Sequence, residues 1–129
     1  MSIRKIVDSI AQACSWHVVE EGDVLSVDVP TGEGRSQVVL ITNDTDVAEQ
    51  AIVRYWSVIG GLEDVDFRRC LEENARLAYG AIAIKDGQLV IMDTQLVQDA
   101  DPMEVGASIG NLAAYADRYE KDLFGTDRY

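Results

Sequence analysis

The dipeptide Asp86-Gly87 stands between two runs of strand-forming residues, AYGAIAIK and QLVIMDT. A two-residue Asp-Gly connection is typical of a type I′ turn, which joins antiparallel strands and sets their register. Pairing outward from this turn gives the hairpin two different faces. The bulky face carries Ile82, Ile84, Leu89 and Ile91. The small face carries Ala81, Ala83, Val90 and Met92.

Neither strand of this hairpin alternates apolar with polar residues, so we expect both of its faces to be covered. We interpret the bulky face as a core layer beneath helices. The small side chains of Ala81 and Ala83 would let another surface come close, either a helix of the same chain or a second subunit.

The C-terminal part of the chain has the most regular helical pattern, and Asp101 followed by Pro102 is typical of a helix start. Apolar residues then recur alternately four and three positions apart, at Val105, Ile109, Leu112, Ala116, Tyr119 and Leu123. A second stripe consists of Gly106, Gly110 and Ala113. Glycine inside a helix costs on the order of 1 kcal/mol relative to alanine, which a close contact would offset. Either the helix packs only on its own sheet, or one stripe meets a partner chain.

The remaining segments complete an α+β pattern. An amphipathic helix is predicted from Ser2, its N-cap, to Ser15. Strand patterns follow in HVVEE, DVLSVDVP, QVVLIT and AIVRYWSVIG. A second helix should begin at Asp64 as its N-cap. The fold class is therefore predicted to be one α+β domain over residues 1–129, with its elements in the order α-β-β-β-β-α-β-β-α.

The second helix would place an amide on its apolar face, which contains Phe67, Cys70, Leu71 and Asn74. A buried amide must find hydrogen-bond partners. Asn74 either bonds backbone groups at the helix end or in the adjoining loop, or it contributes to a polar binding pocket.

The charge balance narrows the choice of partners. The chain has 23 acidic and 11 basic residues, a formal net charge of −12. This charge would repel a phosphate backbone, so we expect neither nucleic acid nor an anionic membrane as a partner. Asp8 and Gln12 interrupt the first apolar stretch, which is therefore unlike a signal peptide. We expect a cytoplasmic protein.

The residue types that carry catalysis are sparse. His17 is the single histidine and lies at a predicted helix-to-strand junction. Cys14 and Cys70 occupy apolar helical faces, where we expect both to be buried and inert. The stretch Asn43 to Asp46 could at most form a weak surface calcium site, because the EF-hand spacing is absent. We therefore expect no enzyme, no metal and no cofactor.

From about Asp64 onward, the chain is similar to the YbjN-like branch of the type III secretion chaperone-like superfamily. The resemblance is carried by ENARLAYGAIAIKDGQLVIMDTQLVQDADPMEV and AAYADRYEKDLFG. It implies an α+β sandwich, in which one antiparallel sheet is flanked by helices, without catalytic residues. In the secretion chaperones of this fold, it also implies small acidic cytosolic homodimers that bind extended segments of client proteins.

Together, these features predict a noncatalytic homodimer that binds partner polypeptide through a sheet face or edge and the last helix. The candidate interface residues are Ala81, Ala83, Val90, Met92, Gly106, Gly110 and Ala113. The alternative is a small-molecule-sensing regulatory domain, with an apolar pocket between the sheet and the long helix.

Overall fold

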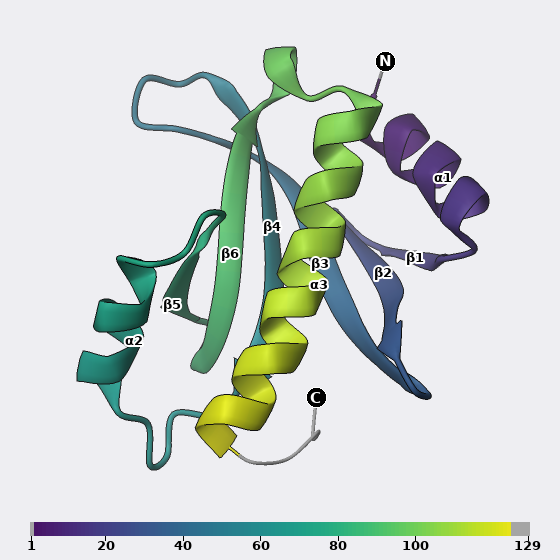
Figure 1. Ribbon diagram of the computed structural model, residues 1–129. Helices are drawn as coiled ribbons and strands as arrows, with labels where there is room; N and C mark the ends of the chain where they lie inside the picture. Colours follow the sequence, from purple (N-terminus) through teal and green to yellow (C-terminus); the bar gives the residue numbers. More distant parts are fainter. Residues whose placement is uncertain (1, 125–129) are drawn as a thin grey trace.

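The computed structural model describes residues 2–124 and has the predicted α+β order (Figure 1). Its helices are α1 (Ile3–Cys14), α2 (Phe67–Asn74) and α3 (Pro102–Phe124), with a short 3₁₀ helix η1 (Val97–Asp99). Its strands are β1 (His17–Glu21), β2 (Val24–Gly32), β3 (Arg35–Thr45), β4 (Ala51–Gly60), β5 (Ala81–Lys85) and β6 (Gln88–Leu96). The predicted sequence of elements is confirmed.

The six strands form one antiparallel sheet in the order β1-β2-β3-β4-β6-β5. The register predicted for the hairpin is confirmed, since Ile82 is opposite Ile91 and Ala83 is opposite Val90. Asp86 and Gly87 have φ values of 52° and 76°, the left-handed pair that a type I′ turn requires. The hairpin adds to the sheet through β6, which pairs with β4.

Helices α1 and α3 lie on one face of the sheet, and α2 lies beside β5 at its edge (Figure 1). The α3 residues of the predicted apolar seam face the sheet. Its first five members, Val105, Ile109, Leu112, Ala116 and Tyr119, are buried. Val53 and Tyr55 of β4 and Ile91 of β6 belong to the same core, so the sheet and α3 form its two layers.

Buried polar contacts fix α3 on the sheet. The Tyr55 hydroxyl donates to Oε1 of Gln95 at 2.8 Å, and Nε2 of Gln95 donates to Oγ of Ser108 at 2.6 Å. At the other end of the helix, the Arg35 guanidinium donates to both carboxylate oxygens of Asp117, each at 3.3 Å. These directional contacts specify how α3 is placed, which the nondirectional burial of apolar surface does not.

Helix α1 lies between the predicted residues Ser2 and Ser15, but Cys14 is not buried as expected. The backbone N–H of Lys5 donates to Oγ of Ser2 at 3.3 Å. The expectation that Cys14 is buried is wrong, because its side chain is exposed in the last turn before left-handed Ser15. The buried surface of α1 is made instead by Ile6, Val7 and Ala11.

Helix α2 differs more from expectation. Its N-cap is Asp66, whose carboxylate accepts the N–H of Arg69 at 3.1 Å, while Asp64 lies in the preceding loop with a φ of 60°. Only Cys70 of this helix is buried. Phe67 and Leu71, which were predicted to share its buried face, are exposed because α2 lies along the sheet edge instead of across the sheet.

Candidate protein-binding surfaces

The first candidate surface is the face of the sheet opposite α1 and α3, called the open face below. Within residues 2–124, no helix lies over it (Figure 1). The β4–β6 register brings Trp56 opposite Met92 and Val58 opposite Val90. The open face is defined by Leu40, Trp56, Val58, Ala81, Ala83, Val90 and Met92.

Four predicted interface residues meet on the open face. Ala81 is exposed, Ala83 and Met92 are half-buried, and Val90 is only 1% exposed. They alternate along β5 and β6 and are opposite one another in pairs, so their side chains share one side of the sheet. The small face of the predicted hairpin therefore continues onto the side of β4 that contains Trp56 and Val58.

Trp56 forms the centre of this face, which the hairpin sequence alone did not reveal. Its side chain is buried, with the residue 8% exposed, between the cross-strand neighbours Leu40 and Met92. The Lys85 ammonium lies 4.6 Å from the ring centroid, a cation–π contact. The alternation of AIVRYWSVIG placed Trp56 opposite in direction to Tyr55, but only the long-range pairing of β4 with β6 places it beside Met92.

The charges on the open face differ from those of the whole chain. Strands β4, β5 and β6 are fully described, and their open-face positions contain no aspartate or glutamate. They do contain Arg54 and Lys85, which pair with Asp44 at 3.1 Å and Asp86 at 3.5 Å. The open face thus has no acidic side chain on β4, β5 and β6, whereas Asp44 of β3 and Asp28 of β2 lie on the same side of the sheet.

The other three predicted interface residues lie on α3, on the opposite side of the sheet. A Cβ at Gly106 would come within 3.6 Å of the Ile10 side chain of α1, so this glycine lies against the chain's own helix. Ala113 is fully buried, whereas Gly110 is half-buried and a Cβ there would point into open space. The structure thus separates Gly106, Gly110 and Ala113 from the hairpin residues.

The second candidate surface lies where α2 meets the edge strand β5. The expectation that Ile84 belongs to a core layer is wrong, because its side chain is 57% exposed. Ile82, Leu89 and Ile91 of the same face are buried as expected. Ile84 differs because it lies next to the end of the edge strand. Of the α2 residues that lie beside this strand, only Cys70 is buried.

Asn74 joins α2 to β5 through its amide group. Its Nδ2 donates to the carbonyl oxygen of Ile82 at 3.2 Å, and the N–H of Ile82 donates to Oδ1 at 2.7 Å. The prediction that Asn74 satisfies nearby backbone groups is therefore confirmed, with the strand edge as its partner. The side chain occupies the position that a further strand would take beside Ile82.

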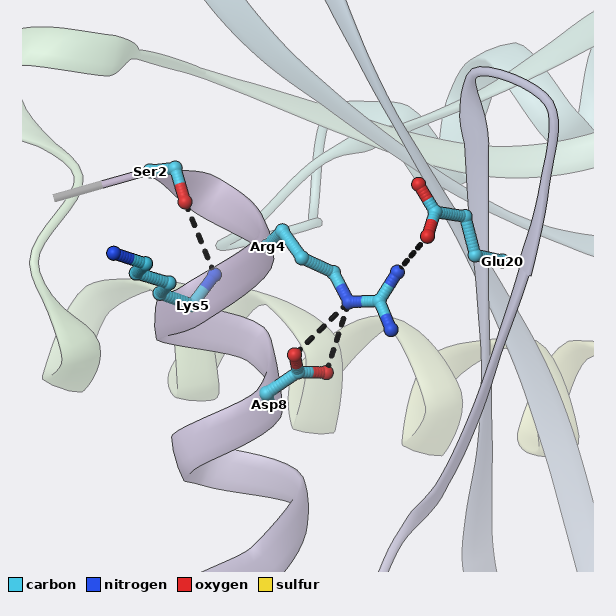
Figure 2. A network of polar contacts seen from close by, with 5 residues as sticks. All are labelled: Ser2, Arg4, Lys5, Asp8 and Glu20. Atoms are coloured by element: carbon cyan, nitrogen blue, oxygen red, sulfur yellow. Dashed lines mark hydrogen bonds and ion pairs between the residues drawn. The ribbon is translucent and has the colours of Figure 1, made fainter.

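A cleft of about 310 Å³ lies at the N-terminal end of α1, next to the ends of β2 and β3. Its apolar lining is Ile3, Leu25 and Ile41, and its polar lining includes Arg4, Glu20 and Asp23. Figure 2 shows the Arg4 guanidinium between Asp8 of the same helix and Glu20 of β1. The hydrogen bond to Asp8 is the largest cause that raises the pKa of Arg4 above its usual value.

The residues considered for catalysis or metal binding are not grouped with one another. His17 is exposed at the start of β1, and Cys70 is buried on α2, where desolvation raises the pKa of its thiol. Asp44 accepts the N–H of Thr45 and pairs with Arg54, contacts that lower the pKa of its carboxyl. Within residues 2–124, no group of three or more histidine, cysteine or acidic side chains could hold a metal ion.

No protein family model matches the chain. No curated protein matches it either. Among the helices that the structure describes, none combines the length and the apolar character needed to cross a membrane.

Proposed function

We propose that the protein is a noncatalytic protein-binding module that forms a homodimer through the open face of its sheet. It acts as a chaperone-like protein or a regulatory adaptor for other polypeptides. The observation that carries this proposal is the apolar open face around Trp56, which no described helix covers. An antiparallel sheet can leave one face to water, but that face is then normally polar.

The composition of the open face fits a protein contact. It includes a tryptophan and a methionine, residue types that are enriched in protein interfaces. Ala81 and Ala83 add little height beside them, so the backbone of a partner can approach β5 closely. A contiguous apolar patch of this kind usually marks an interaction site.

The charge pattern of β4, β5 and β6 permits a second copy of this chain as the partner on this face. Two copies each carry a formal charge of −12 and repel one another over most of their surfaces. The open-face positions of β4, β5 and β6 carry Arg54 and Lys85 and no acidic residue, so contact here brings no carboxylates of these strands together. A two-fold axis through such a patch gives a self-complementary contact.

The resemblance of the region from Asp64 onward to YbjN-like and secretion chaperone-like proteins supports the same function. Those chaperones are cytosolic homodimers that bind segments of other proteins. We accordingly place this protein in the cytoplasm, with an unidentified polypeptide as its client.

A pair of methionine substitutions tests the dimer. Met92→Glu introduces a carboxylate beside Trp56 and should convert the dimer into a folded monomer. Met103→Glu makes the same chemical change at an 83% exposed position on α3 and should leave the dimer intact. Sedimentation velocity gives the mass of each, and circular dichroism confirms folding. A Met92→Glu protein that stays dimeric would show that the dimer does not form through the open face.

A second candidate function is small-molecule sensing at the cleft beside Arg4. The cleft volume of about 310 Å³ is at the lower end of the range for ligand sites, and its apolar floor has polar groups at the rim. A thermal-shift screen against a metabolite panel distinguishes the two functions. A compound that stabilises the protein, and does so less after Arg4→Gln, would favour sensing.

A further inference from the structure

A single row of paired residues crosses the whole sheet on the side opposite α1 and α3. In strand order it consists of Val19, Ser26, Leu40, Trp56, Met92 and Ala81, and it is called the central row below. No member of the central row is charged. Val19 is 40% exposed, and so is Val38, which lies two residues before Leu40 on the same side of β3. The apolar surface around Trp56 therefore extends toward the opposite edge of the sheet.

The two halves of the central row differ in the sizes of their side chains. From the centre of the sheet outward, the half on β4, β6 and β5 has the large Trp56 and Met92 and then the small Ala81. On the half formed by β3, β2 and β1, the small Ser26 has the place equivalent to Met92, and Val19 has the place equivalent to Ala81. Large and small side chains are thus exchanged between the halves.

The charges on this side of the sheet are divided between the same halves. The acidic residues of β1, β2 and β3 are Glu21, Asp28 and Asp44, and the basic residues of β4 and β5 are Arg54 and Lys85. Asp44 and Arg54 already pair with each other at 3.1 Å. Lys85 contacts Asp86 at 3.5 Å, but its ammonium also lies over Trp56 and so reaches the fourth strand of the sheet. Asp28 is exposed on β2.

We infer that two copies pack face to face about a two-fold axis that runs parallel to the strands, between β3 and β4. This axis lays the β4-β6-β5 half of each copy on the β1-β2-β3 half of the other. Met92 is then opposite Ser26 of the second copy, and the Lys85 ammonium lies near Asp28 of the second copy. The inference rests on the proposed function and deepens it, since it specifies which residues of the second copy meet the open face.

Both size and charge disfavour an axis perpendicular to the strands. Such an axis would lay each half on its own equivalent in the second copy. Trp56 and Met92 would then be opposite large side chains, while the acidic halves would meet each other. Only the parallel axis makes this side of the sheet complementary to itself in both properties.

Charge exchange between two chains tests the arrangement. Asp28→Lys and Lys85→Asp should each raise the dissociation constant of the dimer about tenfold or more, because each homodimer brings like charges together at two equivalent sites. An equimolar mixture should dimerise again, since a heterodimer has opposite charges at both sites. Asp122→Lys, the same change at an exposed residue of α3, is the control. It should leave the dimer intact and should not restore Lys85→Asp. Sedimentation equilibrium measures each mass.

A pair of cysteine variants tests the arrangement without changing Lys85. Ser26→Cys and Met92→Cys are made in chains that also carry Cys14→Ser, because Cys14 is exposed. A bismaleimide about 10 Å long, the spacing of packed sheets, should join the two chains when they are mixed. Neither chain should cross-link to a copy of itself.

Failure of this arrangement can be distinguished from failure of the proposed function. A mixture of Asp28→Lys and Lys85→Asp that stays monomeric, or cysteine chains that do not cross-link on mixing, would overturn the parallel axis. Loss of the dimer in Met92→Glu would then still support the open face. Cross-linking of Met92→Cys to itself would indicate the perpendicular axis. A protein that is monomeric at every concentration would overturn both.

Discussion

The side-chain amide of Asn74 pairs with the backbone of Ile82 as a neighbouring strand would, donating at 3.2 Å and accepting at 2.7 Å. This contact ties the end of α2 to the outer edge of the sheet. It also explains why the apolar side of the short helix α2 ends in an amide side chain. Asn74 limits the exposed edge of β5 to the stretch around Ile84, which is where an apolar groove lies between α2 and β5.

Asn74→Ala should lower the free energy of unfolding by about 2 kcal/mol, because two hydrogen bonds are lost and the Ile82 groups lose their partner. Asn74→Asp keeps an acceptor for the Ile82 N–H but opposes its carbonyl oxygen, so it should be destabilised as well. Asn43→Ala, at an exposed position, is the control and should change little. Urea unfolding measures all three. Equal midpoints for Asn74→Ala and Asn43→Ala would contradict the role of Asn74.

Replacement of Gly80 and of Gly110 by alanine should change the free energy of unfolding in opposite directions. Gly80 has a φ of +74°, and a Cβ there would lie 2.6 Å from the carbonyl oxygen of Met92. Gly80→Ala should therefore cost about 2 kcal/mol or more, from backbone strain and the clash. Gly110 is inside α3 with open space around its Cβ direction, so Gly110→Ala should stabilise the helix by up to about 1 kcal/mol.

Thermal unfolding of the two alanine variants checks these signs. Sedimentation of Gly110→Ala adds a second result, since this residue belonged to the interface predicted from sequence. An unchanged dimer agrees with an interface on the open face. Dissociation into monomers would instead indicate that Gly106, Gly110 and Ala113 of α3 form the interface.

The two cysteines should differ in their reaction with a thiol reagent. Cys14 is exposed and should react at once with dithiobis(nitrobenzoic acid). Cys70 is buried, and desolvation raises the pKa of its thiol, so it should react only when the protein opens. Cys14→Ser should remove the fast phase and leave the slow one. A fast phase that survives in Cys14→Ser would show that α2 does not shield Cys70.

Alkaline pH should destabilise the protein through Tyr55. Burial raises the pKa of its hydroxyl above the usual value, so the folded state keeps a proton that the unfolded chain loses above about pH 10. The unfolded state then binds fewer protons, and the free energy of unfolding falls as the pH rises through this range. Urea midpoints at about pH 8 and about pH 10.5, on either side of the usual tyrosine pKa, should differ less for Tyr55→Phe.

Tyr79→Phe, at an exposed position, is the matched control. Its urea midpoint should decrease between the two pH values as much as that of the unchanged protein. Tyr119→Phe should reduce the decrease too, because burial also raises the pKa of Tyr119. A Tyr55→Phe protein with the same pH dependence as the unchanged protein would contradict this assignment.

Local signals in the sequence predicted the order of elements and the hairpin register. Asp86-Gly87 favours a turn with two left-handed residues, and that turn alone determines which residues of β5 and β6 are opposite each other. The apolar seam of α3 likewise follows from the helical period. These features depend on residues close together in the chain.

Features that depend on distant segments were not predictable in the same way. Ile82 and Ile84 have the same pattern, yet one is buried and the other is exposed, because burial depends on how far α2 extends over the strand. Similarly, Trp56 joins the hairpin face only because β4 pairs with β6. Periodicity assigns a side chain to a face, but it does not say which element covers that face.

Sedimentation equilibrium of the unchanged protein, over concentrations up to tens of micromolar, tests the open-face contact most directly. We predict a mass twice that of the chain at the highest concentrations, with dissociation on dilution. We also predict that this mass persists in Met103→Glu and halves in Met92→Glu. A mass equal to one chain at every concentration would contradict the account, because the surface around Trp56 would then be exposed to water without a partner copy.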